Sequence, residues 1–145
     1  MNRLPVERAE ALAELCDEFC VGILYAFGSQ AGAVREWLAG KSSDLDAGPA
    51  DVDVGVKVSK EMRLSVRDKV RLALAIEDLL DVTRIDLVCL NDADPFLAAN
   101  VIRGERLFAR DTCEADEYDL YVLRRAGDLA PLERERLALI LGDAR

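Results

Sequence analysis

The chain has 145 residues, the size of one domain, and its 19 Lys and Arg against 28 Asp and Glu give a formal net charge of −9. It contains no histidine, which excludes Ser-His-Asp catalysis, Cys-His catalysis and the usual histidine-bearing zinc site. The acidic balance also argues against direct nucleic-acid binding, which relies on a basic surface, although divalent metal ions would still allow a nucleotide to bind.

Cysteine spacing and the length of the apolar runs bear on the compartment. The cysteines form no CxxC pair, and we expect reduced thiols in apolar surroundings at Cys16, Cys20, Cys89 and Cys113. No apolar run approaches the ~20 residues of a membrane span, and the N-terminus lacks the apolar core of a signal peptide. We therefore expect a cytoplasmic protein without a membrane partner.

The first third of the chain predicts a helix, a strand and a second helix. Apolar residues at helical spacing predict an amphipathic helix over 5–20. The apolar run 21–27 ends at Gly28 and is typical of a buried strand. Helical spacing returns from Ser29 and stops near Gly40, before a loop rich in turn-forming residues.

The middle of the chain predicts two strands around a long helix. Alternating valines predict a strand over 51–58, and a second apolar run predicts a strand over 84–90. Between them, 62–80 reads as a helix, which Ser65 and Asp68 would cap if it starts late. The apolar face expected for this helix comprises Val66, Val70, Ala73, Leu74 and Leu80.

The last third predicts three helices and a short strand. Asp94 and Pro95 are typical of a helix start, and that helix should end near Arg103 before a strand over 107–109. Two further helices are expected, near 114–125 and 131–141. We therefore expect a single α+β domain over 1–145, with a small mixed sheet flanked by helices and a helical segment, 111–145, packed on it.

Gly28 and Ser29 are the first residues with chemical interest. They lie at a predicted strand-to-helix junction, where glycine allows the backbone to approach a ligand and the helix start offers free amide groups. A phosphate cradle is one interpretation, although Gly-Ser turns also precede many ordinary helices.

Three aspartates are the second feature. Asp51 and Asp53 point to one face of their strand, because side chains two residues apart do so. Asp86 lies within an apolar strand, where a carboxylate is costly unless it is paired or binds metal. If the two strands are neighbours, the three carboxylates form one cluster facing Gly28 and Ser29, as in a two-metal phosphoryl-transfer site.

The order of these motifs resembles the DNA polymerase β-like nucleotidyltransferase superfamily, and most of all its minimal nucleotidyltransferases (MNT domains), which include antitoxins encoded beside HEPN-domain toxins. The resemblance is carried by YAFGSQA (25–31), DVDVGV (51–56), RIDLVCLN (84–91) and DPFLAANVIRGERLFARD (94–111). It implies a polymerase β palm-like fold and Mg²⁺-dependent transfer of AMP from ATP. In the HEPN-paired branch the acceptor is a tyrosine hydroxyl of the RNase toxin, which the modification silences.

The resemblance also implies residue roles. Asp51 and Asp53 would hold the metal that accompanies the triphosphate. Asp53 and Asp86 would flank a second metal, with Asp86 also acting as base or orienter for the acceptor hydroxyl. Gly28 and Ser29 would bind the β- and γ-phosphates.

Two departures from the family pattern leave alternatives open. Gln30 stands where the family has Arg, and 21 residues (30–50) separate the Gly-Ser turn from Asp51. A rival pair, Asp44 and Asp46, lies closer to the turn, but the Ala-Gly-Pro-Ala that follows it is not typical of a strand. The long segment, with Trp37 and Leu38, would lengthen the helix or form a lid or a partner surface. The alternative functions are an antitoxin that acts by binding alone and a small-molecule nucleotidyltransferase of the aminoglycoside type.

Two charged groups carry no assigned role. The acidic stretch 111–119 is interpreted as a solvated helix start, and the alternative is that it faces a basic surface of an RNase. The cations that follow the second strand, Lys57, Lys60, Arg63 and Arg67, are interpreted as solvated surface residues, although they could contact phosphates.

Overall fold

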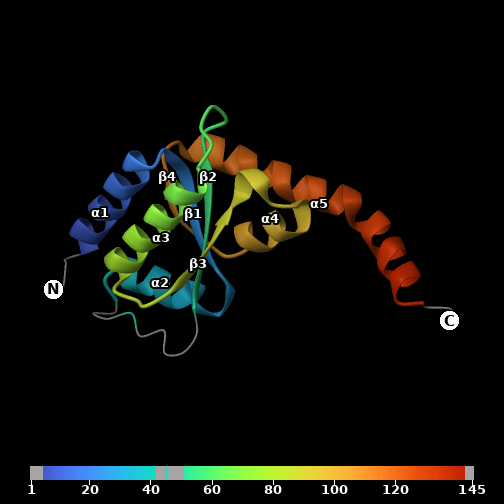
Figure 1. The fold of residues 1–145 in the computed structure, drawn as a ribbon, viewed down its shortest axis with the longest axis horizontal. Helices are drawn as coiled ribbons and strands as arrows, with labels where there is room; N and C mark the ends of the chain where they lie inside the picture. The colour runs from blue at the N-terminus through green and yellow to red at the C-terminus, as the bar shows by residue number, and fades with distance from the viewer. Residues whose placement is uncertain (1–4, 42–44, 46–50, 143–145) are drawn as a thin grey trace.

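A four-stranded sheet with strand order β3-β2-β1-β4 forms the centre of the molecule (Figure 1). The computed structural model describes residues 5–41, 45 and 51–142. β1 (Val21–Phe27) pairs antiparallel with β2 (Val52–Val58) and with β4 (Glu105–Ala109), whereas β3 (Ile85–Cys89) pairs parallel with β2. The prediction of a small mixed sheet in an α+β fold is confirmed.

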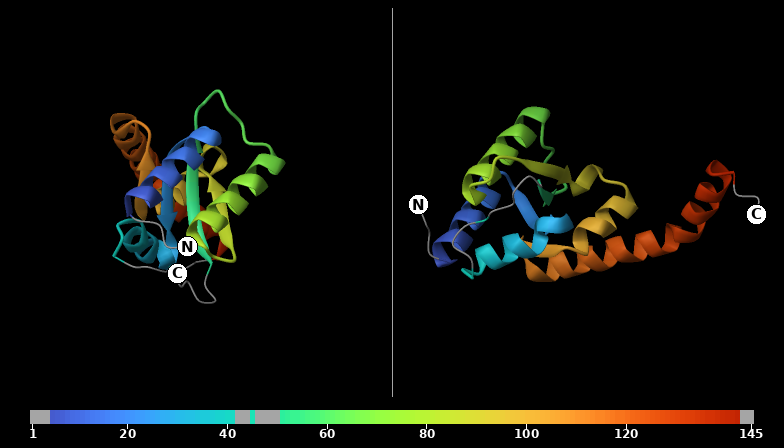
Figure 2. Two further views of the ribbon diagram at one scale, coloured as in Figure 1. Left: turned by 90° about the vertical axis from the view of Figure 1, so that its left-hand side faces the viewer. Right: turned by 90° about the horizontal axis from the view of Figure 1, so that it is seen from below.

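Helices cover both faces of this sheet (Figures 1 and 2). One face packs against α1 (Pro5–Glu18), α2 (Ala31–Leu38) and α3 (Val66–Leu80). The other face packs against α4 (Pro95–Ile102) and α5 (Thr112–Ile140). The alternating valines of β2 are all buried on the first face, as the alternation predicts, so the residues between them point to the second face.

α3 starts at Val66, as the late-start prediction requires. Ser65 accepts a hydrogen bond from the Asp68 backbone N–H at 3.1 Å, and the Asp68 carboxylate accepts one from the Ser65 backbone N–H at 3.3 Å. The predicted apolar face is largely wrong, because Val66, Val70 and Leu74 are exposed. The sheet instead buries the stripe Leu72, Ile76 and Leu80, which has the same i, i+4, i+8 spacing.

The capping box predicts a measurable stability effect. Ser65→Ala should lower the free energy of unfolding by ~1 kcal/mol, because one backbone N–H of the first turn loses its acceptor. Urea denaturation followed by circular dichroism measures this change. Ser59→Ala, at an exposed position outside any helix, is the matched control, and an equal loss in the two variants would contradict the capping role.

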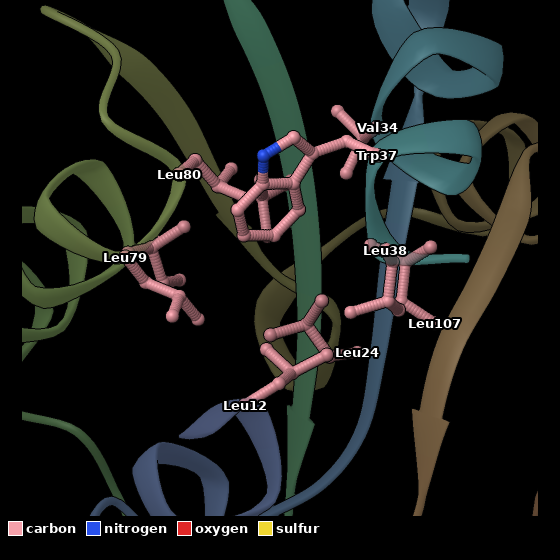
Figure 3. A pocket seen from close by; sticks show the side chains of 10 residues that line it. Leu12, Leu24, Val34, Trp37, Leu38, Leu79, Leu80 and Leu107 are labelled. Atoms are coloured by element: carbon pink, nitrogen blue, oxygen red, sulfur yellow. The ribbon is translucent and has the colours of Figure 1, made fainter. Parts of the chain in front are cut away.

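Trp37 belongs to the core rather than to a lid or a partner surface. It lies in α2 with 7% of its surface exposed, and the Arg8 guanidinium lies 4.4 Å from its ring centroid. Figure 3 shows Trp37 beside the leucines that surround a small gap between α2, α3 and the sheet. The gap has a volume of about 10 Å³ and an apolar lining, so it is a packing space and not a ligand site.

The C-terminal segment corrects a second prediction, because one helix replaces the two expected. α5 continues through Pro131 and bends in its second half (Figures 1 and 2). A proline inside a helix removes one hydrogen bond and favours such a bend without always ending the helix. The buried residues of α5 are Ala115, Val122 and Ala126, none of them beyond the middle of the helix, and the second half extends beyond the sheet.

Contacts to the sheet hold the first half of α5. Arg106 of β4 donates to Asp116 at 2.8 Å and to Asp119 at 3.2 Å, and the buried Tyr25 hydroxyl also donates to Asp119. Asp111 caps the helix by accepting from the Glu114 backbone N–H at 3.1 Å. The acidic stretch is therefore a helix start, as predicted. Two of its carboxylates form ion pairs with Arg106, and of these Asp116 is largely exposed, as predicted, whereas Asp119 is partly buried.

The cysteines are free, but their surroundings differ. Cys16 is buried in the core, whereas Cys113 is exposed at the start of α5, so the prediction of apolar surroundings is wrong for Cys113. Within the described ranges, no helix is both long and apolar enough to cross a lipid bilayer.

Candidate active site

The register of two parallel strands brings two of the predicted aspartates side by side. Asp53 of β2 is the Cα partner of Asp86 of β3. Both face the side of the sheet that carries α4 and α5, because their neighbours Val52, Val54 and Ile85 point into the opposite core. Asp86 is exposed on an edge strand. The expectation that Asp86 is buried, and so needs a partner or a metal ion, is therefore wrong. The expectation that its strand lies beside the strand of Asp53 is correct.

The Gly28 turn lies directly against Asp53. Phe27, the last residue of β1, is the register partner of Asp53, and Gly28 follows it with φ +75°. A Cβ at Gly28 would collide with the Asp53 Oδ2 atom. Glycine is thus favoured here both by the backbone conformation and by the close approach of the Asp53 carboxylate, which a Cβ would displace. Ser29 is exposed in the 3₁₀ turn Gly28–Gln30 that leads into α2.

Asp51 lies just before β2 and has a cationic partner. Its Oδ2 is 3.6 Å from Nε of Arg84, the residue before β3. Local sequence gives no sign of a role for Arg84, because its proximity to Asp51 depends on the pairing of β2 with β3. The rival residues Asp44 and Asp46 lie outside the described residues, so their placement is not compared with that of Asp51.

The surroundings of Asp53 disfavour its ionised form. Partial burial raises its pKa above the ordinary value of 3.8, and the negative charges of Asp86 and Asp51 raise it further. The fold thus holds three negative carboxylates close together and partly removes one of them, Asp53, from water. Such crowding is unfavourable unless a cation binds, and it is a feature of functional sites.

The donor set fits a hard divalent cation held by few protein ligands. Carboxylate oxygens at Asp53 and Asp86, with a glycine turn that leaves open backbone beside them, match the preference of Mg²⁺ for one or two carboxylates plus substrate phosphates. As the side chains stand, no three Asp, Glu or Cys residues of the described ranges converge into a ready-made metal cage. The third carboxylate, Asp51, is instead engaged in the ion pair with Arg84.

Comparison with models of known protein families identifies the family to which this fold belongs. Residues 10–113 match the model described as polymerase beta, nucleotidyltransferase. The chain belongs to the polymerase beta nucleotidyltransferase family. The match includes β1, the Gly28 turn, both aspartate-bearing strands and the start of α5, so the family assignment predicted from the motifs is confirmed. Comparison with curated proteins gives no match.

Solved structures of toxin-antitoxin complexes contain chains with the same nucleotidyltransferase fold. A toxin-antitoxin with AMP-PNP matches with TM-score 0.65 at 20% identity, over 91% of this chain and 94% of that chain. A chain of the tri-AMPylated Shewanella oneidensis HEPN toxin in complex with MNT antitoxin matches with TM-score 0.62 at 18% identity, over 94% and 96%. A mutant of the MntA-HpeT toxin-antitoxin matches with TM-score 0.66 at 18% identity, over 91% and 94%. At these identities the likeness establishes the fold.

Proposed function

We propose that the protein is an MNT-type antitoxin that transfers AMP from ATP to a tyrosine hydroxyl of a HEPN-domain RNase toxin, with Mg²⁺ as cofactor. The observation that carries the proposal is the Asp53–Asp86 pair on neighbouring strands, beside a turn whose positive φ and close approach to Asp53 favour glycine. Family membership and the fold shared with MNT–HEPN complexes support it.

Each site residue has a role in this reaction. Asp51 and Asp53 would hold one Mg²⁺, and Asp53 and Asp86 a second. The metal would neutralise phosphate charge and increase the electrophilicity of the α-phosphorus. The Gly28 backbone and the Ser29 hydroxyl, both exposed, would bind the β- and γ-phosphates through N–H and O–H donors.

The chemical step is a substitution at phosphorus. The acceptor oxygen attacks the α-phosphorus of ATP and forms a new O–P bond. The bond from the α-phosphorus to the bridging oxygen breaks, and pyrophosphate leaves with that electron pair. Asp86, exposed and adjacent to Asp53, accepts the proton of the acceptor hydroxyl as general base.

Label transfer tests this function. The protein is incubated with its toxin partner, Mg²⁺ and ATP labelled at the α-phosphate, and the toxin is then analysed by gel and mass spectrometry. We expect one or more AMP groups on a toxin tyrosine, and no transfer when EDTA replaces Mg²⁺ or when label is placed on the γ-phosphate. Absence of label from the toxin when Mg²⁺ and α-labelled ATP are both present would contradict the proposal.

Two observations favour a second candidate, an antitoxin that neutralises its partner by contact alone. Asp51, a proposed metal ligand, is ion-paired with Arg84. Gln30 stands where the resemblance implies an arginine, so the phosphate site has one cation fewer than the family pattern implies. Full neutralisation of the toxin by the Asp53→Asn variant would establish this alternative, whereas loss of neutralisation supports AMP transfer.

A further inference from the structure

A second hollow lies at the opposite end of the sheet from the Asp53–Asp86 pair. Asp53 and Asp86 lie near the starts of β2 and β3. Because these strands are parallel, both of them finish at the opposite end of the sheet. There, η2 (Leu90–Asp92), the start of α4 and the middle of α5 border an open hollow with a volume of about 380 Å³. Small-molecule sites usually have volumes of roughly 300–1,000 Å³.

Cations line this hollow in a chain whose net charge is −9. Lys57, Lys60 and Arg125 all border it, and in the part of the chain that the structure describes neither lysine forms an ion pair. Lys57 Nζ lies 5.1 Å from the centroid of the Tyr118 ring. Asp92 also borders the hollow, but its carboxylate is 3.5 Å from Lys69 Nζ, which offsets its charge. The lining is therefore positive, and we expect it to attract an anion.

The walls of the hollow are fixed by hydrogen bonds and packing. Asn91 donates to the Val58 carbonyl and accepts from the Val58 N–H, both at 3.0 Å, so η2 is held against the end of β2. Arg125 Nη1 donates to the Tyr121 hydroxyl at 3.0 Å and orients that ring. Leu90, Ala98 and Val122 are buried beneath and give the hollow an apolar floor. Such a preformed lining lowers the entropic cost of binding.

The hollow thus combines positive charge with aromatic and apolar surface. Tyr121 is 54% exposed, which leaves ring surface available to a ligand. Burial is the main cause that raises the pKa of Tyr118 to about 12, so its hydroxyl stays protonated and can donate a hydrogen bond at neutral pH. A bare phosphate ion would use the cations but leave the rings and the apolar floor uncovered.

We propose that this hollow is a second ligand site that takes a small anion attached to a planar ring, the chemistry of a nucleoside monophosphate. Lys57 and Lys60 bind the phosphate, and Tyr121 and the apolar floor contact the ring. The carboxylate end of the sheet needs a metal ion to accept phosphate, whereas this lining does not. The proposal does not depend on the nucleotidyl-transfer reaction.

Calorimetry without divalent metal tests the proposal. The full chain is titrated in EDTA with AMP, with adenosine and with inorganic phosphate. We expect AMP to bind, and adenosine and phosphate each to bind about tenfold or more weakly, because each lacks half of the recognised chemistry. Absence of AMP binding, or equal affinity for AMP and phosphate, would overturn the proposal.

Variants locate the site. Lys60→Gln and the double variant Lys57→Gln, Lys60→Gln should weaken AMP binding, the double variant by about tenfold or more, and leave adenosine binding unchanged. Lys41→Gln, an exposed lysine elsewhere, should have no effect, nor should Asp53→Asn in EDTA. Because Lys60 is exposed, its substitution tests the site without disturbing the core. Loss of AMP binding in Asp53→Asn, or unchanged affinity in the double variant, would show that the proposed location is wrong.

Discussion

Asp53→Asn should reduce AMP transfer by on the order of 10³-fold. Asparagine keeps the size of the side chain but removes the charge that sits between Asp86 and the Gly28 turn. In the proposed reaction this carboxylate is shared by both metal ions, so no neighbouring group replaces it. The measurement is the initial rate of label transfer to the toxin at saturating ATP.

The same substitution should leave the fold intact and stabilise it at neutral pH. The folded-state pKa of Asp53 is raised by burial, by Asp86 and by Asp51. Folding therefore favours the protonated carboxyl, and the ionised form destabilises the native state once the pH rises above the ordinary Asp range. The variant should unfold at an equal or higher temperature than wild type at about pH 8, and the difference should shrink at about pH 4. Asp78→Asn, at an exposed position on α3, is the control and should change neither rate nor stability. A variant that is inactive because it is unfolded would contradict this prediction.

Gly28→Ala should affect both stability and catalysis. Alanine at φ +75° is strained, and its Cβ would displace the Asp53 carboxylate. We expect a loss of about 1–2 kcal/mol in the free energy of unfolding from the left-handed conformation. We also expect a fall in transfer rate of about 10²-fold, because the displaced carboxylate is a proposed metal ligand. Denaturant unfolding and the label-transfer rate measure the two effects.

Gly32→Ala is the matched control in the same segment. Gly32 lies in α2, and a Cβ there has no atom within 4 Å. Alanine should therefore stabilise the helix by ~1 kcal/mol and leave the transfer rate unchanged. If the two alanine variants behave alike, the close approach of Gly28 to Asp53 has no role in catalysis.

The sequence predicted the parts of the site that depend on local pattern. Period-two alternation determines that Asp53 projects away from the buried valines, and the apolar run ending at Gly28 predicts a strand followed by a turn. The capping residues Ser65 and Asp68 follow from a local motif and are present in the structure.

Other parts depend on which elements become neighbours, and local pattern does not contain that information. The exposure of Asp86 follows from the edge position of β3, and the ion pair of Asp51 follows from the pairing that brings Arg84 near. The local sequence around Lys57 and Lys60 indicates solvated residues, since the residues that complete the hollow, Asn91, Tyr118 and Arg125, come from distant segments. Pro131 predicts a break between two helices, but in the structure a single helix continues through it with a bend (Figure 1).

The parallel pairing of β2 and β3 has a consequence for how the site tolerates change in chain length. The spacing of Asp53 and Asp86 is determined by backbone hydrogen bonds between adjacent strands, which lie about 4.8 Å apart, and not by the loops that precede them. Insertions or deletions between the Gly28 turn and Asp51 can therefore alter what surrounds a bound nucleotide while the two carboxylates keep their separation. Within that stretch α2 packs Ala31, Val34 and Trp37 into the core, so a change of length inside the helix would disturb the packing even though the strands set the separation of the carboxylates.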